Sequence, residues 1–424
     1  MLFARLGEES ISRGQFLAEA DALASTLPEG RYAINFCEDR YLFCLGLVAS
    51  LRRGLITLLP PDRSTRHLER LAHDYPGALL LADQPRPDAP AAHRVTRLPV
   101  TPLAAEANLG VDAGQLAVIA FTSGSTGAPR AHPKTWGSLV ESARLIDTQL
   151  GGTLGNTLIA TVPPQHMYGL ELSILLPLCQ GTVMETDKLF FPADIAAALH
   201  RSPAPRVLVT TPIHLRALLN SGLTLPPLAL LVSATAPLDP VLARICEQRF
   251  NAPLLEIYGC TEAGSIAGRR TARDEPWTLF EGIELQAEGQ HCRVRAPHLP
   301  EPVELHDALI LLDDRHFELE GRATDLINIA GKRGSLSAFN RILLDIPGVL
   351  DGAFFLPESG IETTPRLIVF VVAPTLASDE LLQSLRKELD PAFLPRAIHR
   401  VDALPRNETG KLPRQALERL ALTA

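Results

Sequence analysis

Short apolar runs alternate in the first 250 residues with longer stretches whose apolar positions recur at helical spacing. The predicted strands are residues 31–36, 55–59, 157–162, 206–210 and 228–233, and the predicted helices are residues 41–52, 170–178, 214–219 and 238–250. A strand followed by a helix is the repeating unit of a parallel sheet flanked by helices. The pattern therefore predicts an α/β fold with mainly parallel sheets.

The pattern changes at residue 282, where short strands follow one another closely. The predicted strands there are residues 283–287, 292–296, 308–312 and 316–319. They indicate a small β subdomain. After residue 321 the pattern predicts a hairpin, a helix near residues 337–345, a strand at 367–373 and a helix at 379–389. This last part has enough apolar positions to fold as an α+β domain of its own.

Composition limits the classes of function. The chain has 424 residues, 46% of them hydrophobic, and a formal net charge of -8. An acidic chain without a basic block is not expected to bind nucleic acid. No apolar run is long enough to cross a bilayer and no leader begins the chain, so we expect a cytoplasmic protein without a membrane partner. The six cysteines form no C-x-x-C pair, which predicts reduced core thiols rather than a zinc site or disulfides.

A loop rich in glycine and hydroxyl groups follows the apolar run 116–120. Its sequence is FTSGSTGAPR, residues 121–130. Gly124 and Gly127 let the backbone approach a ligand closely, and hydroxyl groups add donors to the amides of a turn. These hydroxyl residues are Thr122, Ser123, Ser125 and Thr126. The spacing differs from that of a Walker loop, so the residues alone leave two interpretations, a phosphate-binding loop or a solvated Ser/Gly turn.

Four more segments extend the comparison: EIYGCTEAGS (256–265), ELHDALILL (304–312), GRATDLINIAGKRGSL (321–336) and LPRNETGKLPR (404–414). In order and spacing, the five segments resemble the adenylate-forming superfamily of acyl-CoA synthetases, luciferases and peptide-synthetase adenylation domains. The resemblance covers most of the chain from about residue 117. It implies an N-terminal domain of residues 1–320 with the ATP and acid site, a hinge at 321–324 and a mobile C-terminal domain of residues 325–424.

The resemblance implies that the glycine-rich loop wraps the β- and γ-phosphates of ATP. The family usually has Lys after the loop proline, where this chain has Arg130, followed by His132 and Lys134. Positive charge near the departing pyrophosphate is thereby retained. The hinge also departs from the family, with Thr324 where Asp or Lys is common.

The 258–262 segment would serve the rest of the nucleotide and a magnesium ion. Tyr258 and Gly259 correspond to the adenine side, Thr261 to a hydroxyl near the α-phosphate, and Glu262 to the magnesium carboxylate. Magnesium needs few protein carboxylates because phosphate and water complete its shell. Considered alone, the Thr-Glu pair is also typical of a turn that caps a helix.

Three residues of the second half complete the implied site. Asp307 stands 14 residues before Gly321, the family offset for the ribose carboxylate, which can accept bonds from both hydroxyls. The usual Thr-Gly before it is replaced, so a surface-turn aspartate is the alternative. Arg322 would join it at the nucleotide. Lys411 alone would be a solvated charge, but it matches the family lysine that bridges the carboxylate and the α-phosphate and is therefore the predicted catalytic cation.

The acid side is predicted from VPPQHMYG, residues 162–169. His166 is either a catalytic or gating group or a core histidine. Domains that select α-amino acids usually carry an Asp here, and this chain does not. The implied pocket residues are His166, Met167, Tyr168, Gly169, His214, Ser233, Ala234, Thr235 and Gly264. A few hydroxyl and imidazole groups in an apolar wall suit an aromatic acid with a phenolic hydroxyl.

A narrower resemblance rests on PPQHMYG, HPKTW and AGKRGSL and on the short stretch before the phosphate loop. It is to compact enzymes that start aryl polyene and xanthomonadin-type pigments. It implies ATP- and magnesium-dependent activation of 4-hydroxybenzoate or a hydroxycinnamate and transfer to an acyl carrier protein. The alternatives are a CoA ligase for an aryl or medium-chain acid, a catalytically silent homologue that acts as a binding protein, and an oxidative, luciferase-like use of the adenylate.

Overall fold

The computed structural model describes residues 1–60, 63–86, 92–104, 109–122, 130–288, 291–322, 326–329, 332–357, 366–407, 410 and 412–423. The chain divides into two compact units. The first comprises residues 1–285 and 294–303, and the second residues 286–293 and 304–424.

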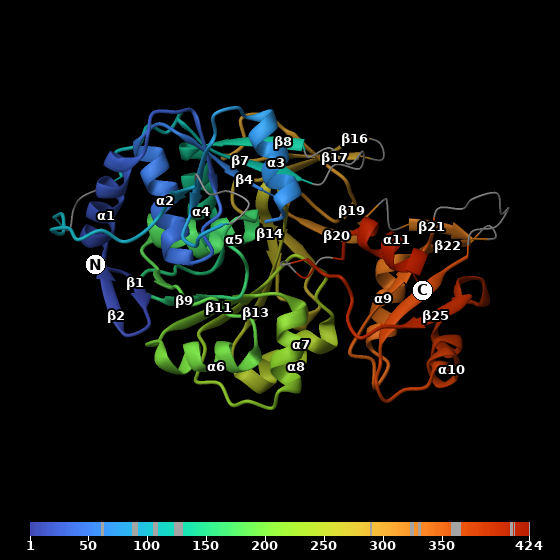
Figure 1. Ribbon diagram of the computed structural model, residues 1–424. Helices are drawn as coiled ribbons and strands as arrows, with labels where there is room; N and C mark the ends of the chain where they lie inside the picture. The colour runs from blue at the N-terminus through green and yellow to red at the C-terminus, as the bar shows by residue number, and fades with distance from the viewer. Residues whose placement is uncertain are drawn as a thin grey trace. The chain divides into compact units, whose positions relative to one another are not determined.

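The first unit contains a six-stranded sheet in the order β6-β5-β3-β4-β7-β8 (Figure 1). Its strands are β3 (Tyr32–Asn35), β4 (Ile56–Leu59), β5 (Leu79–Ala82), β6 (His93–Arg94), β7 (Leu116–Thr122) and β8 (Arg130–Thr135). Every pairing is parallel except β7 with β8. Because side chains alternate along a strand, Val118 and Ala120 of β7 enter one core cluster and Ile119 another.

A longer run of strands forms the second sheet of this unit, in the order β15-β14-β13-β12-β11-β9-β10-β1-β2. The strands are β1 (Leu2–Leu6), β2 (Glu9–Ser12), β9 (Thr157–Ala160), β10 (Val183–Glu185), β11 (Arg206–Thr210), β12 (Leu230–Ser233), β13 (Leu254–Cys260), β14 (Gly264–Arg269) and β15 (Trp277–Leu279). The pairings from β1 through β10, β9, β11 and β12 to β13 are parallel. The carboxyl ends of these strands, where α/β folds bind ligands, therefore share one edge.

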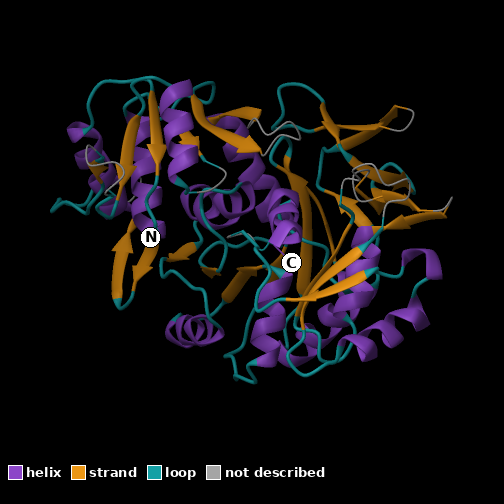
Figure 2. Ribbon diagram, turned by 45° about the vertical axis from the view of Figure 1, so that its right-hand side comes forward, coloured by secondary structure: helices purple, strands orange, loops and turns teal. Residues whose placement is uncertain are grey.

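Helices separate and cover the two sheets (Figure 2). They are α1 (Arg13–Thr26), α2 (Arg40–Arg52), α3 (Thr65–Asp74), α4 (Trp136–Gln149), α5 (Met167–Leu170), a π-helix (Glu171–Gln180), α6 (Pro192–Arg201), α7 (Pro212–Asn220) and α8 (Pro240–Phe250). Residues of α1, α2, α4, α5 and the π-helix share one core cluster with strands of both sheets. Helices α6, α7 and α8 pack on the other face of the longer sheet, and α3 packs on the other face of the six-stranded sheet.

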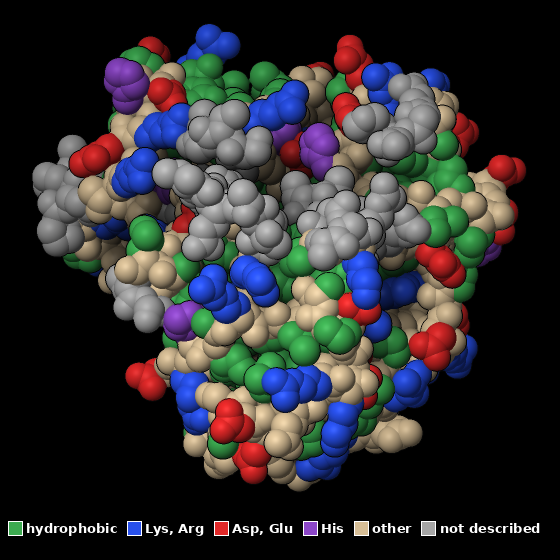
Figure 3. All heavy atoms as spheres, turned by 90° about the vertical axis from the view of Figure 1, so that its right-hand side faces the viewer, with side chains coloured by type: hydrophobic (Ala, Val, Ile, Leu, Met, Phe, Trp, Pro, Cys, Tyr) green, Lys and Arg blue, Asp and Glu red, His purple; other side chains and the backbone are tan. Residues whose placement is uncertain are grey.

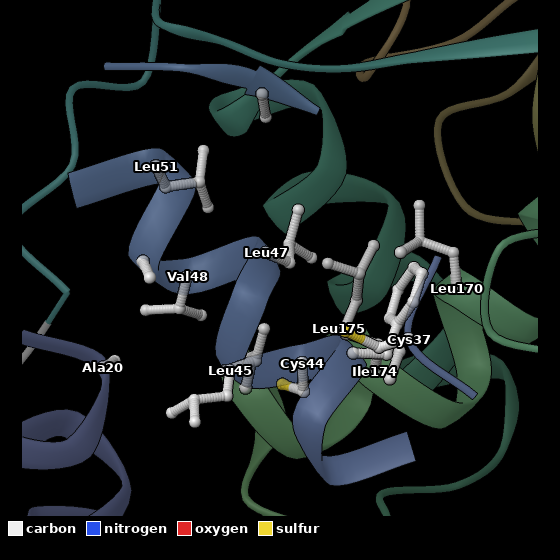
Figure 4. Close-up of a cluster of buried hydrophobic side chains, with 14 of the residues drawn as sticks. Ala20, Cys37, Cys44, Leu45, Leu47, Val48, Leu51, Leu170, Ile174 and Leu175 are labelled. Atoms are coloured by element: carbon white, nitrogen blue, oxygen red, sulfur yellow. The ribbon is translucent and has the colours of Figure 1, made fainter. Parts of the chain in front are cut away.

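The central cluster shows why α2 is helical and where it packs. Its side chain cap is Asp39, which accepts from the Leu42 amide at 2.8 Å, and its apolar residues are almost all buried. In Figure 4, Cys44 and Leu47 of α2 lie beside Ile174 and Leu175 of the π-helix. Burying such side chains contributes roughly 1.5–3 kcal/mol each. This packing anchors the π-helix that carries Glu171, a residue of the site described below.

The second unit is built around a sheet in the order β23-β24-β25. Its helices and strands are β19 (Asp307–Leu311), β20 (His316–Arg322), β21 (Leu326–Ile329), β22 (Lys332–Ser335), α9 (Leu336–Leu344), β23 (Asp351–Phe355), β24 (Ile368–Val372), α10 (Ser378–Glu388), β25 (Ala397–Arg400) and α11 (Arg414–Thr423). Helices α9 and α10 pack in one core cluster, and Leu417 of α11 in another. Three further strands contain the boundaries between the units at residues 285, 293 and 303. They are β16 (Glu284–Glu288), β17 (His291–Arg295) and β18 (Val303–Leu305).

The predicted mixed α/β class is confirmed, with large, mainly parallel sheets between helices. The predicted boundaries at residues 320 and 325 remain a prediction. Within the described residues, no helix has the length and apolar character to span a membrane. On the face drawn in Figure 3, basic, acidic and apolar side chains are interspersed.

Candidate active site

The glycine-rich loop closes the β7–β8 hairpin. Thr122, the last residue of β7, pairs with Arg130, the first residue of β8, so the loop leaves and re-enters the sheet at one point. Residues 123–129, which include the predicted Ser123, Gly124, Ser125, Thr126 and Gly127, lie outside the described residues. The Arg130 side chain is exposed. Its role beside the pyrophosphate remains a prediction.

A tight turn joins β13 to β14 and carries Glu262. Cys260 pairs with Gly264 and Gly259 with Ser265, which leaves residues 261–263 at the tip. A Cβ on Gly259 would lie 2.2 Å from the Gly264 carbonyl oxygen, so this crossing requires glycine. The turn belongs to a β-hairpin. The alternative interpretation of Thr261 and Glu262 as a helix cap is therefore wrong, because the next residues continue into an antiparallel strand.

Glu262 lies beside the hairpin that bears the loop. Its Oε1 is 3.5 Å from His132 Nε2, which is 3.0 Å from the Thr122 hydroxyl oxygen. Burial lowers the pKa of His132, and the Glu262 carboxylate opposes this shift without cancelling it. The imidazole thus lies between a hydroxyl of β7 and a carboxylate of the β13–β14 turn.

The Glu262 carboxylate fits a magnesium site that has a single protein ligand. Its side chain is 21% exposed. Among the residues that the structure describes, no three His, Cys, Asp or Glu side chains gather as a metal cluster. A single carboxylate is nevertheless compatible with magnesium, which takes its other ligands from phosphates and water. The role of Glu262 as the magnesium ligand remains a prediction.

Three buried side chains form hydrogen bonds to this turn and to the start of β14. The Lys134 ammonium donates to the main-chain carbonyl oxygen of Glu262, and His298 Nε2 donates to that of Ala263 at 2.6 Å. Glu171 accepts two bonds from Ser265. Burial lowers the pKa values of Lys134 and His298. Lys134 therefore does not add an exposed charge beside Arg130, as its sequence position suggested.

Sequence reasoning missed Glu171 and His298. Glu171 had a signal, because it is a single carboxylate within the apolar stretch 170–178 and a buried carboxylate needs partners. His298 had none, since its contact with Ala263 depends entirely on the tertiary fold.

Tyr258, the predicted adenine-side aromatic, is almost buried. Its ring centroid lies 5.5 Å from that of Trp277, and the Arg269 guanidinium lies 4.5 Å from the Trp277 ring centroid. Thr261 is half-buried at the turn. The assignment of both residues to the nucleotide remains a prediction.

The 166–169 segment forms the first turn of α5. His166 is half-buried at the cap position, and Met167 and Gly169 are buried. The Tyr168 hydroxyl donates to the carbonyl oxygens of Thr210 (3.2 Å) and Val232 (3.1 Å), and burial raises its pKa. That hydroxyl is therefore engaged by the ends of β11 and β12, which leaves the ring as the part able to face a substrate.

His214 sits in a chain of hydroxyl groups at the carboxyl edge of the sheet. Its Nδ1 is 3.0 Å from the Thr161 hydroxyl and 3.1 Å from that of Thr211, and Thr161 also contacts Thr210 at 3.0 Å. Burial lowers the pKa of His214. The two hydroxyl contacts fix the orientation of the ring, and its burial favours the neutral form over the charged one.

The loop after β12 is strained. Ser233 is fully buried, and its hydroxyl has no hydrogen-bond partner within the described part of the chain. Ala234 is buried, and Thr235 has a φ of 77°, which is costly for a β-branched residue. Strain of this kind clusters at ligand sites. Gly264, the last predicted pocket residue, is buried in the β13–β14 turn.

The predicted residues of the second unit are described only in part. The backbone of Asp307 pairs with that of Arg322 across the β19–β20 hairpin. Lys411 and Thr324 lie outside the described residues. The roles of Asp307, Arg322 and Lys411 remain predictions.

Comparison with known proteins adds to this geometry. Residues 13–304 match the profile of a family described as AMP-binding enzyme. A 4-coumarate–CoA ligase of Halorhodospira halophila is 32% identical over 301 residues, which are 69% of this chain and 73% of that protein. A 3,4-dihydroxybenzoate–[aryl-carrier protein] ligase of Bacillus anthracis is 22% identical over 71% of this chain and 73% of its own length.

Solved structures share the fold. An anthranilate CoA ligase in complex with anthranoyl-AMP superposes with a TM-score of 0.81 over 98% of this chain and 94% of its own, at 17% sequence identity.

Proposed function

This chain belongs to the AMP-binding enzyme family, whose members form acyl-adenylates, and from that premise we propose that it activates an aromatic carboxylic acid and transfers it to an acyl carrier protein. The acid would be 4-hydroxybenzoate or a hydroxycinnamate. The activating nucleotide would be ATP with magnesium.

One observation carries the proposal. The Glu262 carboxylate lies 3.5 Å from the imidazole of His132. His132 belongs to the β7–β8 hairpin, whose strands flank the glycine-rich segment. The strand ends that flank the glycine-rich segment, the exposed Arg130 and the Glu262 carboxylate thus lie in one corner of the first unit. This combination supports ATP chemistry better than any single motif does.

The reaction would proceed in two balanced steps. A carboxylate oxygen of the acid attacks the α-phosphorus, the bond to the bridging oxygen breaks, and pyrophosphate leaves. A thiolate then attacks the acyl carbon, and AMP leaves with the former carboxylate oxygen. Arg130 would offset charge on the departing pyrophosphate, and Lys411 charge at the α-phosphate. Magnesium held by Glu262 would neutralise phosphate charge.

The chemistry around His214 supports an aromatic acid with a hydroxyl substituent. Thr161 and Thr211 engage Nδ1, so Nε2 is the ring atom left to meet a substrate. Tyr168 belongs to the same strand end, because its hydroxyl binds the Thr210 carbonyl oxygen and the Thr210 hydroxyl contacts Thr161. The substrate names of the two relatives, coumarate and dihydroxybenzoate, are of the same chemical class. His166 would border the carboxylate end.

A CoA acceptor is the second candidate. It is favoured by the 4-coumarate–CoA ligase at 32% identity, whereas the aryl-carrier-protein ligase favours a carrier protein. The narrower resemblance to the pigment enzymes makes the carrier protein our proposal.

Two assays test the proposal in sequence. Exchange of labelled pyrophosphate into ATP is measured over benzoates, cinnamates and fatty acids, and we expect the highest rates with hydroxylated aromatic acids. The protein is then given the preferred acid, ATP and either CoA or a holo carrier protein. Transfer to CoA but not to the carrier protein would exclude the carrier protein as the acceptor. If none of the acids supports pyrophosphate exchange, the result would favour a catalytically silent homologue.

A further inference from the structure

Lys134 is a buried charge that the chemistry above does not use. It is the fifth residue of β8 and its side chain is 7% exposed. A buried ammonium is costly, and an apolar residue would fill this position at lower cost. Its hydrogen bond goes to the Glu262 carbonyl oxygen. The ammonium therefore lies on the main-chain side of the residue whose carboxylate would hold the metal.

Glu171 holds the next part of the same turn from the π-helix. Its Oε1 accepts from the Ser142 hydroxyl at 2.6 Å and from the Ser265 amide at 3.2 Å, and its Oε2 accepts from the Ser265 hydroxyl at 2.6 Å. The residue is 1% exposed. These donors satisfy the carboxylate and fix the start of β14, directly opposite Gly259.

His298 holds the remaining carbonyl group. Its Nε2 donates to Ala263, and its own carbonyl oxygen accepts from the Ser138 hydroxyl of α4 at 2.6 Å. The main-chain groups of residues 262, 263 and 265, in and next to one turn, are thus bound by three buried side chains from separate parts of the chain. A turn that needed only to connect two strands could leave its carbonyl groups to water.

The charges reinforce this arrangement. Glu171 and Glu262 both attract the Lys134 ammonium, and in a buried setting such attraction is screened little. Without Lys134, the Glu262 carbonyl oxygen and the nearby buried carboxylate would both lose a favourable partner.

We propose that Lys134 is a positioning residue. With Glu171 and His298 it fixes the 261–264 turn and so holds the Glu262 carboxylate in the position from which it would bind the metal ion of the metal–nucleotide complex. The inference rests on the proposed function, since it assigns Glu262 to the metal. It adds a buried support that no motif of the glycine-rich loop or of the 258–262 segment contains.

The test compares Lys134→Met, which keeps the length but loses the charge and donor, with Lys134→Arg, which keeps both. Lys188→Met is the control, since Lys188 is 72% exposed and pairs with Glu38 at the surface. Amide hydrogen exchange is measured on the nucleotide-free protein. The dependence of ATP binding on Mn²⁺ concentration is measured by the paramagnetic resonance of free Mn²⁺.

In Lys134→Met we expect exchange across residues 258–266 to be roughly 10-fold faster, as loss of one buried bond predicts, and the Mn²⁺ requirement to rise by a similar factor. Lys134→Arg should recover part of both, and Lys188→Met should change neither. Unchanged exchange, or faster exchange with an unchanged Mn²⁺ requirement, would overturn the proposal. If Lys134→Met does not fold, Lys134→Gln is put through the same two measurements. Neither readout needs the acid, so failure of acid-dependent exchange in the wild type would count against the proposed function alone.

Discussion

Replacing Gly264 by alanine should destabilise the first unit through two separable effects. Gly264 has a φ of 73°, and a Cβ there would lie 2.5 Å from Oε1 of Glu171. The left-handed backbone costs about 1–2 kcal/mol for alanine. Displacing a buried carboxylate from its donors costs about 1.5–3 kcal/mol more. We therefore expect Gly264→Ala to lower the free energy of unfolding by about 2.5–5 kcal/mol.

Gly54→Ala isolates the backbone effect. Gly54 has a φ of 70° with nothing within 4 Å of an added Cβ, so this variant should lose only about 1–2 kcal/mol. The two tryptophans of the chain, Trp136 and Trp277, both belong to the first unit. Urea unfolding followed by tryptophan fluorescence therefore reports on the unit that contains both glycines.

The difference between the two variants is the quantity that tests the reasoning. If Gly264→Ala and Gly54→Ala unfold at the same urea concentration, Glu171 does not lie against the turn as described. A loss of pyrophosphate exchange in Gly264→Ala beyond that of Gly54→Ala would further link the turn to Glu262.

Glu262→Gln should raise the Mg²⁺ concentration for half-maximal exchange by about 10-fold or more, since ligand loss weakens metal sites strongly; an unchanged Mg²⁺ requirement would remove it as a ligand. Lys411→Ala should lower adenylation by roughly 10²–10³ and spare thiol transfer from a supplied acyl-adenylate, and equal loss of both steps would contradict its role. Burial lowers the folded-state pKa of His214. Its contribution to the free energy of unfolding is therefore complete above the unfolded-state pKa of about 6.5 and is lost as the pH falls below that value. The urea midpoint should therefore fall less between pH 7 and 5 in His214→Asn than in wild type, and identical slopes would refute this.

Local periodicity predicted much of the fold. The strand at 206–210 is β11 with the same bounds, and the helix at 41–52 is α2 with one more residue at its start. Both depend on short-range patterns of apolar residues, a short run for the strand and helical spacing for the helix, which the sequence displays directly. The helix at 170–178 was also predicted, but its π geometry has no signature in that pattern.

The sequence could identify the site residues that belong to motifs but not the buried side chains that hold the 261–264 turn. Thr122, Arg130 and Glu262 belong to motifs, and the structure brings the hairpin of the first two next to the third. The bonds of Glu171 and His298 to the turn join residues far apart in the chain, so only tertiary packing reveals them. Likewise, the sequence predicted Tyr168 as a pocket residue but could not show that its hydroxyl binds carbonyl oxygens at the strand ends of the sheet.

Oxygen transfer from the acid to AMP tests the central claim most directly. The preferred aromatic acid is labelled with ¹⁸O in its carboxylate and incubated with the wild-type protein, ATP, magnesium and the thiol acceptor, and the products are measured by mass spectrometry. Our account predicts AMP that carries one labelled oxygen, together with unlabelled pyrophosphate. Unlabelled AMP, or ADP with labelled phosphate, would contradict an acyl-adenylate and with it the proposed function.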